Sequence, residues 1–414
     1  MKILLSEGSG LTSRQVARLL HDAGHRVGVV SSDPVGLTRF TRAVGAWHRV
    51  PAFGPDPLAW LEAAAAVHRR HGYDVLLPTQ EQVTVLSWAQ GSSQLDGVRT
   101  VVPPFDALRA VQDKVAAHAT LSRLGLAQPE TAVLATPDDL AAWDRFPVYL
   151  KAPVGTASGG VVHVGDRAAL GTAAQAWIRA GVFDAGLGGV VAQAPVPGPL
   201  AMVQAVFDDG RLVAFHANQR VREGARGGAS HKRSLALPEG RAMVERLGRD
   251  LGWHGALSAD LILGEAGPVV IDVNPRLVEP ANAARAGVDL VGALLEVADG
   301  TGPAPRPDGR PDVGTHQLLL AVLGAAQHGR GRRGVGAELW AGASHRGPYR
   351  HSHEELTPVA HDWRAVTPLA MAALATLVLP ATWEWFSSGS VANYAITPQG
   401  WADLCSGARP SSPA

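Results

Sequence analysis

A β-hairpin pattern between Gly255 and Arg276 constrains the fold of this chain more than any other stretch. The segment reads GALSADLILGEAGPVVIDVNPR, which is two apolar runs joined by a turn sequence at residues 264–267. The pattern therefore predicts an antiparallel strand pair in a sheet built mainly from Leu, Ile and Val.

Polar side chains gather on one face of this predicted hairpin. Asp272 and Asn274 are two residues apart, so they point to the same face of a strand. If the turn is centred near Ala266, Asp260 lies opposite Asp272 and Ser258 lies opposite Asn274. Two unpaired carboxylates would repel each other and lose hydration, and a hard cation such as Mg²⁺ would remove that cost. The alternative is a solvated polar face on an edge hairpin.

The length and composition of the chain are those of a globular protein with two or three domains. At 414 residues the chain exceeds the size at which a single core stops growing. Lys+Arg and Asp+Glu are balanced at 37 each, so no bulk charge attracts nucleic acid or an anionic membrane. The single cysteine, Cys405, excludes an internal disulfide and fits a cytoplasmic location.

Two segments bear on secretion and membranes. The N-terminal sequence MKILLSEGSG reaches an acidic, glycine-rich loop too early for a signal peptide. Residues 366–386 are nearly uncharged, but Pro368 and Pro380 leave an uninterrupted helix that is too short to span a bilayer. We therefore expect a buried helix there and no membrane partner.

Residues 1–104 have the pattern of an N-terminal, Rossmann-like domain with a parallel sheet. The expected elements are strands at residues 2–6, 26–31, 74–78 and 99–102 and helices at residues 12–23 and 58–71. Thr12 or Ser13 is the expected N-cap of the first helix. The order of the first three elements is that of a βαβ unit.

The first strand-to-helix turn also imitates a dinucleotide site. It carries Gly8-Ser9-Gly10, and an acid, Asp33, follows about twenty residues later. Ser13 stands where the third glycine of that fingerprint is expected. Because many such turns use glycine only to make a tight turn, a bound nicotinamide is the less favoured interpretation.

Residues 105–300 contain the pattern of a phosphate cradle. Lys151 ends a predicted strand, and the loop at residues 153–160 with three glycines, Thr and Ser leads into a second strand at residues 161–164. Small residues let backbone N–H groups approach anionic oxygens, and the lysine supplies a charge. The alternative is a flexible hairpin tip. Lys114 lies upstream on a helix that is predicted to continue without a break from Phe105.

Residues 301–414 are expected to form a C-terminal extension of unknown role. A linker rich in Pro and Gly at residues 301–312 precedes it. The extension is predicted to hold an apolar helix at residues 317–326 and a basic, glycine-rich loop at residues 329–336. A single amphipathic helix is expected just before the linker, at residues 282–298.

Taken in this order, these features resemble the ATP-grasp superfamily, which includes carbamoyl phosphate synthetase, biotin carboxylase and amino-acid ligases. The most specific part is Ile271-Asp272-Val273-Asn274-Pro275-Arg276, which is similar to the acid-x-Asn-Pro-Arg run of the family, with Asp272 in place of the usual Glu. The resemblance covers roughly residues 1–300. It implies an α/β fold with a Rossmann-like domain at residues 1–104 and an α+β ATP-grasp nucleotide domain at residues 105–300. The lid subdomain would span about 130–195, and residues 301–414 would follow as the extension.

The resemblance also implies an ATP site. Lys114 matches the first nucleotide lysine of the family, and Lys151 with its glycine-rich loop matches the second lysine and the phosphate lid. The implied ATP-binding residues are Lys114, Lys151, Gly155, Thr156, Ala157, Ser158, Gly159, Gln193, Ala194 and Val196. Asp260, Asp272 and Asn274 would hold one or two Mg²⁺ ions, with Mn²⁺ as a substitute. Arg276 and Arg226 are the implied catalytic residues. Ala194 stands where the family often has a hinge acid.

The implied function is an ATP- and Mg²⁺-dependent carboxylate–amine ligase. Such an enzyme would activate a small-molecule or amino-acid carboxylate as an acyl phosphate and couple it to an amine or a similar nucleophile. The expected partners are these two small molecules, and a homodimer is the expected protein assembly. The alternatives are a carboxylase or carbamoyl-type enzyme of the same superfamily, and a catalytically silent nucleotide-binding regulatory protein. The sequence specifies neither substrate.

Overall fold

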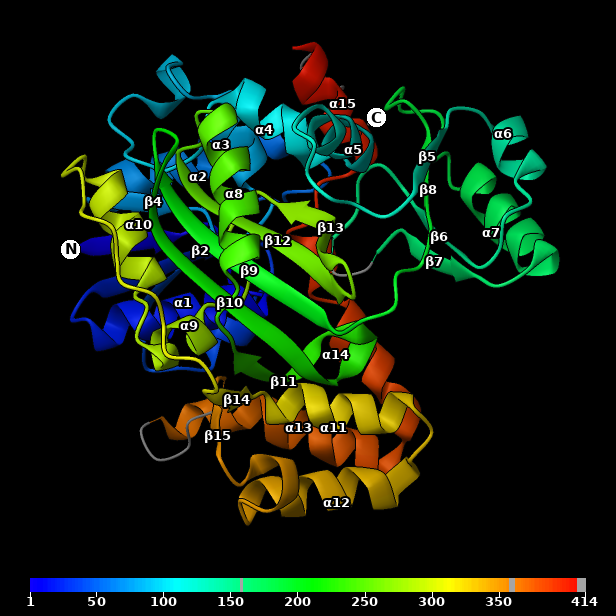
Figure 1. Cartoon of the computed structure of the whole chain (residues 1–414). Helices are drawn as coiled ribbons and strands as arrows, with labels where there is room; N and C mark the ends of the chain where they lie inside the picture. Colours follow the sequence, from blue (N-terminus) through cyan, green and yellow to red (C-terminus); the bar gives the residue numbers. More distant parts are fainter. Residues whose placement is uncertain (157–158, 357–361, 408–414) are drawn as a thin grey trace.

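Three sheets and the helices that cover them make up the described part of the chain (Figure 1). The computed structural model describes residues 1–156, 159–356 and 362–407. The result is a mixed α/β structure with one parallel sheet and one larger mixed sheet, which agrees with the predicted fold class at this level.

The N-terminal sheet is parallel and has the strand order β3-β2-β1-β4. Its strands are β1 (Lys2–Leu5), β2 (Arg26–Ser31), β3 (Val44–Arg49) and β4 (Val75–Leu77). The helices of this part are α1 (Leu11–Asp22), α2 (Pro57–His71) and α3 (Val83–Trp88). The βαβ opening predicted from the sequence is therefore confirmed.

The central sheet has seven strands in the order β13-β12-β9-β10-β11-β14-β15. They are β9 (Leu200–Asp208), β10 (Arg211–Glu223), β11 (Ala229–Ser234), β12 (Gly255–Gly264), β13 (Gly267–Asn274), β14 (Gly314–His316) and β15 (Ser352–Glu354). All neighbours pair antiparallel except β14 and β15. The last two strands come from beyond the predicted linker, so the C-terminal segment completes this sheet.

Successive residues of β9 point into two different cores, one on each face of the central sheet. Phe207 packs with Leu257 and with Leu247 of α8 (Pro238–Asp250). Val206 packs on the opposite face, with Leu294 of α10 (Leu290–Ala298) and with apolar residues of the N-terminal sheet. Burying a side chain of this size contributes roughly 1.5–3 kcal/mol. These two cores hold the hairpin β12–β13 in place from both sides.

A third, smaller sheet has the order β5-β8-β6-β7. Its strands are β5 (Thr131–Leu134), β6 (Val148–Lys151), β7 (Val161–Val164) and β8 (Val190–Gln193), and its helices are α6 (Pro137–Ala142) and α7 (Arg167–Arg179). Figure 1 shows this unit to one side of the central sheet. The helices α4 (Phe105–Gln112) and α5 (Lys114–Arg123) precede it in the chain.

The C-terminal helices contact two separate parts of the molecule. The helices are α11 (Leu318–Gln327), α12 (Gly331–Ala343), α13 (Val366–Val378), α14 (Trp383–Ser388) and α15 (Pro398–Ser406). Figure 1 shows α11, α12 and α13 grouped beside β14, whereas α15 lies near α4 and α5. Trp401 of α15 is fully buried and meets Phe105 edge to face, with ring centroids 5.9 Å apart.

Several predicted elements differ from the structure. The helix expected to run on from Phe105 breaks at Asp113, whose side chain accepts a hydrogen bond from Ala116 N–H at 2.7 Å and caps α5. The helix expected at residues 282–298 is divided into α9 (Ala281–Ala286) and α10 by Gly287, which has a left-handed φ of 97°. Most of the glycine-rich stretch at residues 329–336 is helical instead of a loop, because α12 begins at Gly331.

Two further differences concern the N-terminal part. Neither Thr12 nor Ser13 is the N-cap of α1, which begins after Gly10, because both hydroxyls bond to other parts of the chain. Residues 99–102 form no strand, and the fourth strand of the sheet is β3, which lies at the edge beside β2. The side chains of β3 are mostly half-buried, so its sequence lacks the apolar run of a central strand.

The helix expected between Pro368 and Pro380 is α13, which begins at Val366 and ends before Pro380. The expectation that this helix is buried is wrong for one face, because Met371, Leu374 and Val378 are exposed. Within the described ranges, no helix has both the length and the apolar character that crossing a membrane requires.

The cap of α5 provides a test of the fold. Asp113→Ala removes the acceptor for the first-turn N–H group and should lower the free energy of unfolding by about 1 kcal/mol. Asp106→Ala is the control, because the Asp106 side chain is 96% exposed in the first turn of α4 and is not the cap of that helix. Denaturant unfolding followed by circular dichroism measures both. Equal midpoints for the two variants would contradict the assigned cap.

Candidate active site

A cavity of about 1330 Å³ lies where the N-terminal part, the central sheet, the small sheet and the C-terminal segment meet. All the sequence-predicted site residues in the described ranges line it. They are Lys114, Lys151, Gly155, Thr156, Gly159, Gln193, Ala194, Val196, Arg226, Asp260, Asp272, Asn274 and Arg276. Ala157 and Ser158, which were also predicted, lie outside the described residues. The structure therefore brings together residues from six separate stretches of the described sequence.

The register of the hairpin β12–β13 is the one predicted from its turn. Asp260 pairs with Asp272, and Ser258 pairs with Asn274. The register shifts immediately after Asp260, which marks a β-bulge beside the acidic pair. Ser258 donates to the carbonyl of Arg276 at 2.6 Å and so fixes the chain that leaves the hairpin.

Burial and the neighbouring carboxylate of Asp272 both disfavour the charged form of Asp260. Burial raises the pKa of Asp260 to about 7, and the charge of Asp272 adds to the effect. A nearby cation would stabilise both charged forms. Two carboxylates and the carboxamide of Asn274 provide oxygen ligands, which Mg²⁺ and Mn²⁺ prefer. The donor set on this hairpin therefore fits a divalent cation.

Two lysines reach this acidic pair from different elements. Lys114 is the first residue of α5, and its Nζ lies 3.5 Å from Asp272 Oδ1 and 3.5 Å from the carbonyl oxygen of Gly155. Lys151, at the end of β6, donates from Nζ to the carbonyl of Ile271 at 2.6 Å. Burial lowers the pKa of Lys151, and the charge of Asp272 opposes that effect. The two lysines thus link the glycine-rich loop and its strand to the hairpin β12–β13.

Arg276 is nearly buried and is held by three oxygen-bearing side chains. Its guanidinium lies 3.4 Å from Glu81 Oε1 and donates to Thr156 Oγ1 at 3.1 Å and to Asn274 Oδ1 at 3.4 Å. Glu81 follows β4, so it belongs to the edge of the parallel sheet where ligand contacts are common. Glu81 was not among the predicted site residues, although its position after that strand was a signal.

Arg226 lines the same cavity but contacts a different part of the chain. Its backbone has a left-handed φ of 51°, its N–H donates to Gln327 Oε1 at 2.8 Å, and its Nε donates to Ser387 Oγ at 3.2 Å. Both partners belong to the C-terminal helices. Arg276 therefore lies beside the hairpin, whereas Arg226 lies beside the C-terminal helices α11 and α14.

The predicted hinge residues lie at the end of β8. Gln193 donates to Thr131 Oγ1 at 3.3 Å, and Ala194 N–H donates to the carbonyl of Glu130 at 2.8 Å. The backbone N–H of Ala194 therefore already has a partner within the protein. Ala194 and Val196 both border the cavity.

The glycine turn before α1 does not offer an anion site. The carboxylate of Glu7 accepts from Ser9 N–H at 2.5 Å and from Gly10 N–H at 2.9 Å, and the hydroxyl of Ser13 also donates to it. A dinucleotide pyrophosphate would need these same N–H groups. Glu7 thus occupies the position that the nicotinamide hypothesis requires, and that hypothesis has no geometric support.

Comparisons with solved structures identify the fold of the chain. No family model and no curated protein matches the sequence. Solved structures do match. Biotin carboxylase from Campylobacter jejuni aligns with a TM-score of 0.60 and 17% identity over 76% of this chain and 74% of its own. The biotin carboxylase domain of Hydrogenobacter thermophilus 2-oxoglutarate carboxylase aligns with a TM-score of 0.59 and 17% identity, covering 76% and 73%.

N5-carboxyaminoimidazole synthetase from Staphylococcus aureus aligns with a TM-score of 0.56 and 13% identity over 77% of this chain and 82% of its own. At identities this low, the likeness establishes the fold and leaves the reaction open. The chain has the ATP-grasp fold that these enzymes share, as the resemblance in its sequence predicted.

Proposed function

We propose that this protein is an ATP- and Mg²⁺-dependent ligase that activates a carboxylate as an acyl phosphate and couples it to an amine. The observation that carries the proposal is the meeting of Lys114, Lys151 and Arg276 with the acidic pair of the hairpin in one cavity. The proposed architecture is a Rossmann-like domain at residues 1–104, a nucleotide domain at residues 105–300 with its lid at about 130–195, and a C-terminal extension at residues 301–414.

The ligands of similar structures support a nucleotide in this cavity. The Hydrogenobacter thermophilus domain is a complex with MgADP, ADP and bicarbonate, and the Campylobacter jejuni enzyme is a complex with a β,γ-ATP compound. Carboxyaminoimidazole ribonucleotide synthase from Aspergillus clavatus is a complex with ATP. By analogy, we assign ATP and Mg²⁺ as the cofactors of this chain.

The positive groups of the cavity are proposed to bind the phosphates. Lys114 contacts the glycine-rich loop at the carbonyl of Gly155, and Lys151 ends the strand that leads into that loop. The loop residues Gly155, Thr156 and Gly159 line the cavity, and the backbone N–H groups of Gly155 and Thr156 suit anionic oxygens. Gln193 and Val196 border the proposed adenine end. Asp260, Asp272 and Asn274 would hold Mg²⁺, which supplies Lewis-acid neutralisation of phosphate charge when bound.

The proposed chemistry has two steps. First, an oxygen of the substrate carboxylate attacks the γ-phosphorus, the bond to ADP breaks, and ADP leaves. Arg276 is proposed to bind the oxygens of the resulting acyl phosphate, because its guanidinium lies beside both Asn274 and Thr156. The amine nitrogen then attacks the acyl carbon, inorganic phosphate leaves, and the nitrogen loses a proton. Arg226 is a second candidate contact, on the C-terminal side.

A carboxylase is the alternative enzyme. Its specific support is the presence of bicarbonate in one of the similar structures. In that case bicarbonate takes the place of the organic carboxylate in the first step. A silent nucleotide-binding regulator is less favoured, because both lysines and the paired aspartates are present at the cavity.

The function is tested by measuring ADP release from Mg²⁺ and ATP with a panel of carboxylates, including bicarbonate, against a panel of amines. We expect ADP release that requires one organic carboxylate and one amine, with a product that mass spectrometry identifies. Release with bicarbonate alone would favour the carboxylase, and nucleotide binding without release across the panel would favour the regulator.

The phosphate role of Lys151 predicts a selective loss of affinity. Lys151→Met keeps most of the side-chain volume and removes the charge, so the Kd for ATP should rise about ten- to a hundredfold. Adenosine lacks phosphates, and its Kd should be unchanged. Calorimetric titration of both ligands measures the difference, and an equal loss for ATP and adenosine would show that the substitution damaged the site as a whole.

The metal role of Asp272 predicts a change in Mg²⁺ dependence. Asp272→Asn should raise the Mg²⁺ concentration for half-maximal ADP release by about tenfold or more, because a charged ligand is replaced by a neutral one. Glu265→Gln is the matched control, since Glu265 is an exposed acid in the turn of the same hairpin. Identical Mg²⁺ curves for both variants and the unmodified protein would contradict the metal assignment.

A further inference from the structure

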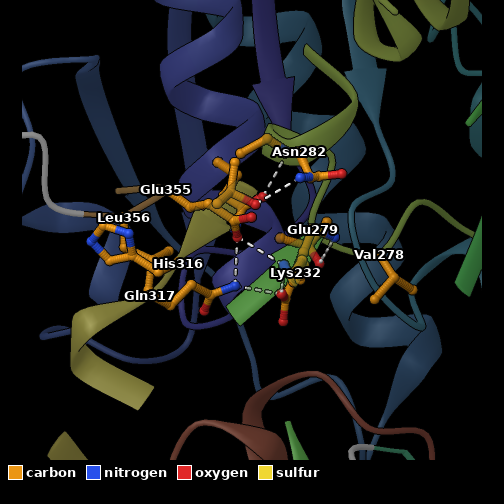
Figure 2. Close-up of polar contacts among 12 residues, drawn as sticks. Lys232, Val278, Glu279, Asn282, His316, Gln317, Glu355 and Leu356 are labelled. Atoms are coloured by element: carbon orange, nitrogen blue, oxygen red, sulfur yellow. Dashed lines mark hydrogen bonds and ion pairs between the residues drawn. The ribbon is translucent and has the colours of Figure 1, made fainter. Parts of the chain in front are cut away.

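A cluster of polar side chains lies beside the proposed nucleotide site, where β11, the segment after β13 and the C-terminal strands meet. Lys232 of β11 is in contact with the carboxylates of Glu279 and Glu355, and its Nζ lies 2.8 Å from Glu355 Oε2. Gln317 donates to the same two carboxylates. Figure 2 shows the shared contacts of Lys232 and Gln317. We call these four residues the Lys232 cluster.

One member of the Lys232 cluster faces the cavity with a carboxylate. Glu279 lines the cavity and its side chain is 14% exposed, whereas Glu355 is 1% exposed and does not line it. Lys232 and Gln317 both donate to Glu279 Oε2. Among the residues that the structure describes, none donates to the other oxygen, Oε1. That oxygen is an available acceptor at the cavity wall.

The backbone holds Glu279 in an unusual conformation. Its φ is 53°, in the left-handed region that non-glycine residues rarely adopt. The conformation is fixed by its own N–H, which donates to Thr12 Oγ1 at 3.2 Å, and by Ala281 N–H, which donates to Gln15 Oε1 at 2.9 Å. Both partners are on α1. The structure therefore maintains a strained residue at the point where its side chain reaches the cavity.

The charges around Glu279 do not cancel. The Lys232 cluster contains two carboxylates and one ammonium group. Burial lowers and the two carboxylates raise the pKa of Lys232, and the net effect is a raised pKa, so this lysine stays charged. Arg276, the next cation along the wall, is matched by Glu81. In these contacts, three carboxylates thus face two cations.

The hydroxyl of Tyr394 responds to the same excess of negative charge. Tyr394 lines the cavity, and burial raises the pKa of its hydroxyl. The charges of Glu7, Glu81 and Glu279 raise that pKa further, while Arg276 opposes them. A positively charged ligand group would be stabilised at this wall.

The cavity also carries exposed apolar side chains from both ends of the chain. Val35, after β2, is 64% exposed, Met371 of α13 is 49% exposed, and Trp385 of α14 is 68% exposed. All three line the cavity. Large apolar side chains exposed inside one cavity are typical of a ligand site. An apolar group of a ligand would remove their surface from water.

We propose that Glu279 anchors the acceptor substrate of the ligase, and that the acceptor is a cationic amine with a bulky apolar group. Glu279 Oε1 accepts a hydrogen bond from the ammonium group and then takes one proton from it, so that the neutral nitrogen attacks the acyl carbon as phosphate leaves. The apolar group lies against Val35, Met371 and Trp385. The inference rests on the proposed ligase function and adds the class of its amine.

The unmodified full-length protein provides the first test, with three probes of similar shape. Calorimetric titrations in the presence of MgADP compare 2-phenylethylamine, 2-phenylethanol and 3-phenylpropionate, and methylamine is the amine without an apolar group. We expect 2-phenylethylamine to bind at least about tenfold more tightly than 2-phenylethanol and methylamine, because a charged hydrogen bond and apolar burial act together. Equal or tighter binding of 2-phenylethanol would overturn the proposal, whereas 3-phenylpropionate tests the proposed contacts of the donor carboxylate.

Two matched variants separate a binding role from a structural one. Glu279→Gln and Glu355→Gln each remove one negative charge from the Lys232 cluster, but only Glu279 faces the cavity. Glu279→Gln should raise the Kd and the KM of the amine about ten- to a hundredfold and leave the Kd of ATP unchanged. Glu355→Gln removes the same charge but not the acceptor oxygen at the cavity, so it should raise the Kd of the amine by clearly less than Glu279→Gln does. Equal losses in both variants would show that the cluster acts only in folding and would overturn the proposal.

The apolar contact has its own variant. Trp385→Ala should reduce the preference for 2-phenylethylamine over methylamine, and an unchanged preference would contradict the apolar part of the proposal. Because Trp385 is 68% exposed, this change should not disturb folding. MgATP binding and ADP release are measured in parallel. Their absence would reject the ligase function, whereas turnover that prefers neutral or anionic acceptors would reject only this inference.

Discussion

The cross-strand pair of Asp260 and Asp272 is the interaction on which the rest of the cavity depends. Two carboxylates held side by side on a rigid hairpin repel each other, and burial raises the pKa of Asp260 to about 7. Two lysines place positive charge near this pair. Lys114 extends from the start of α5, and Lys151 extends from the end of β6 in the small sheet. A bound divalent cation would neutralise the two aspartates, and the phosphates of a nucleotide would neutralise the two lysines.

The C-terminal segment takes part in the fold and in the cavity. Its strands β14 and β15 extend the central sheet, and its residues Glu355 and Gln317 complete the Lys232 cluster. Trp385 then lines the cavity from a different helix. A linker rich in Pro and Gly therefore does not separate an independent appendage here. The linker leads instead to strands of the central sheet and to helices that line the cavity.

The sequence predicted the parts of the site that depend on local rules. The pairing of Asp260 with Asp272 follows from a short turn and from the two-residue period of a strand, and the position of Lys151 follows from a strand that ends in a glycine-rich loop. The unbroken helix from Phe105 was wrong, because a helix break depends on one cap, Asp113. The helix expected at residues 282–298 was also wrong, because the left-handed backbone of Gly287 ends α9 before α10 begins. The apolar periodicity of that stretch does not show this break.

The sequence by itself determined the ATP-grasp resemblance, the hairpin and the residue types that suit a phosphate and a metal. Only the tertiary structure decided that Glu7 fills the anion position of the first glycine turn, and that Glu279 faces the cavity with a carboxylate oxygen. The reason is physical. The conformation of Glu279 is fixed by α1, and its carboxylate is held by Lys232 of β11 and by Gln317 of the C-terminal segment. Contacts between such distant segments leave no periodic pattern in the sequence.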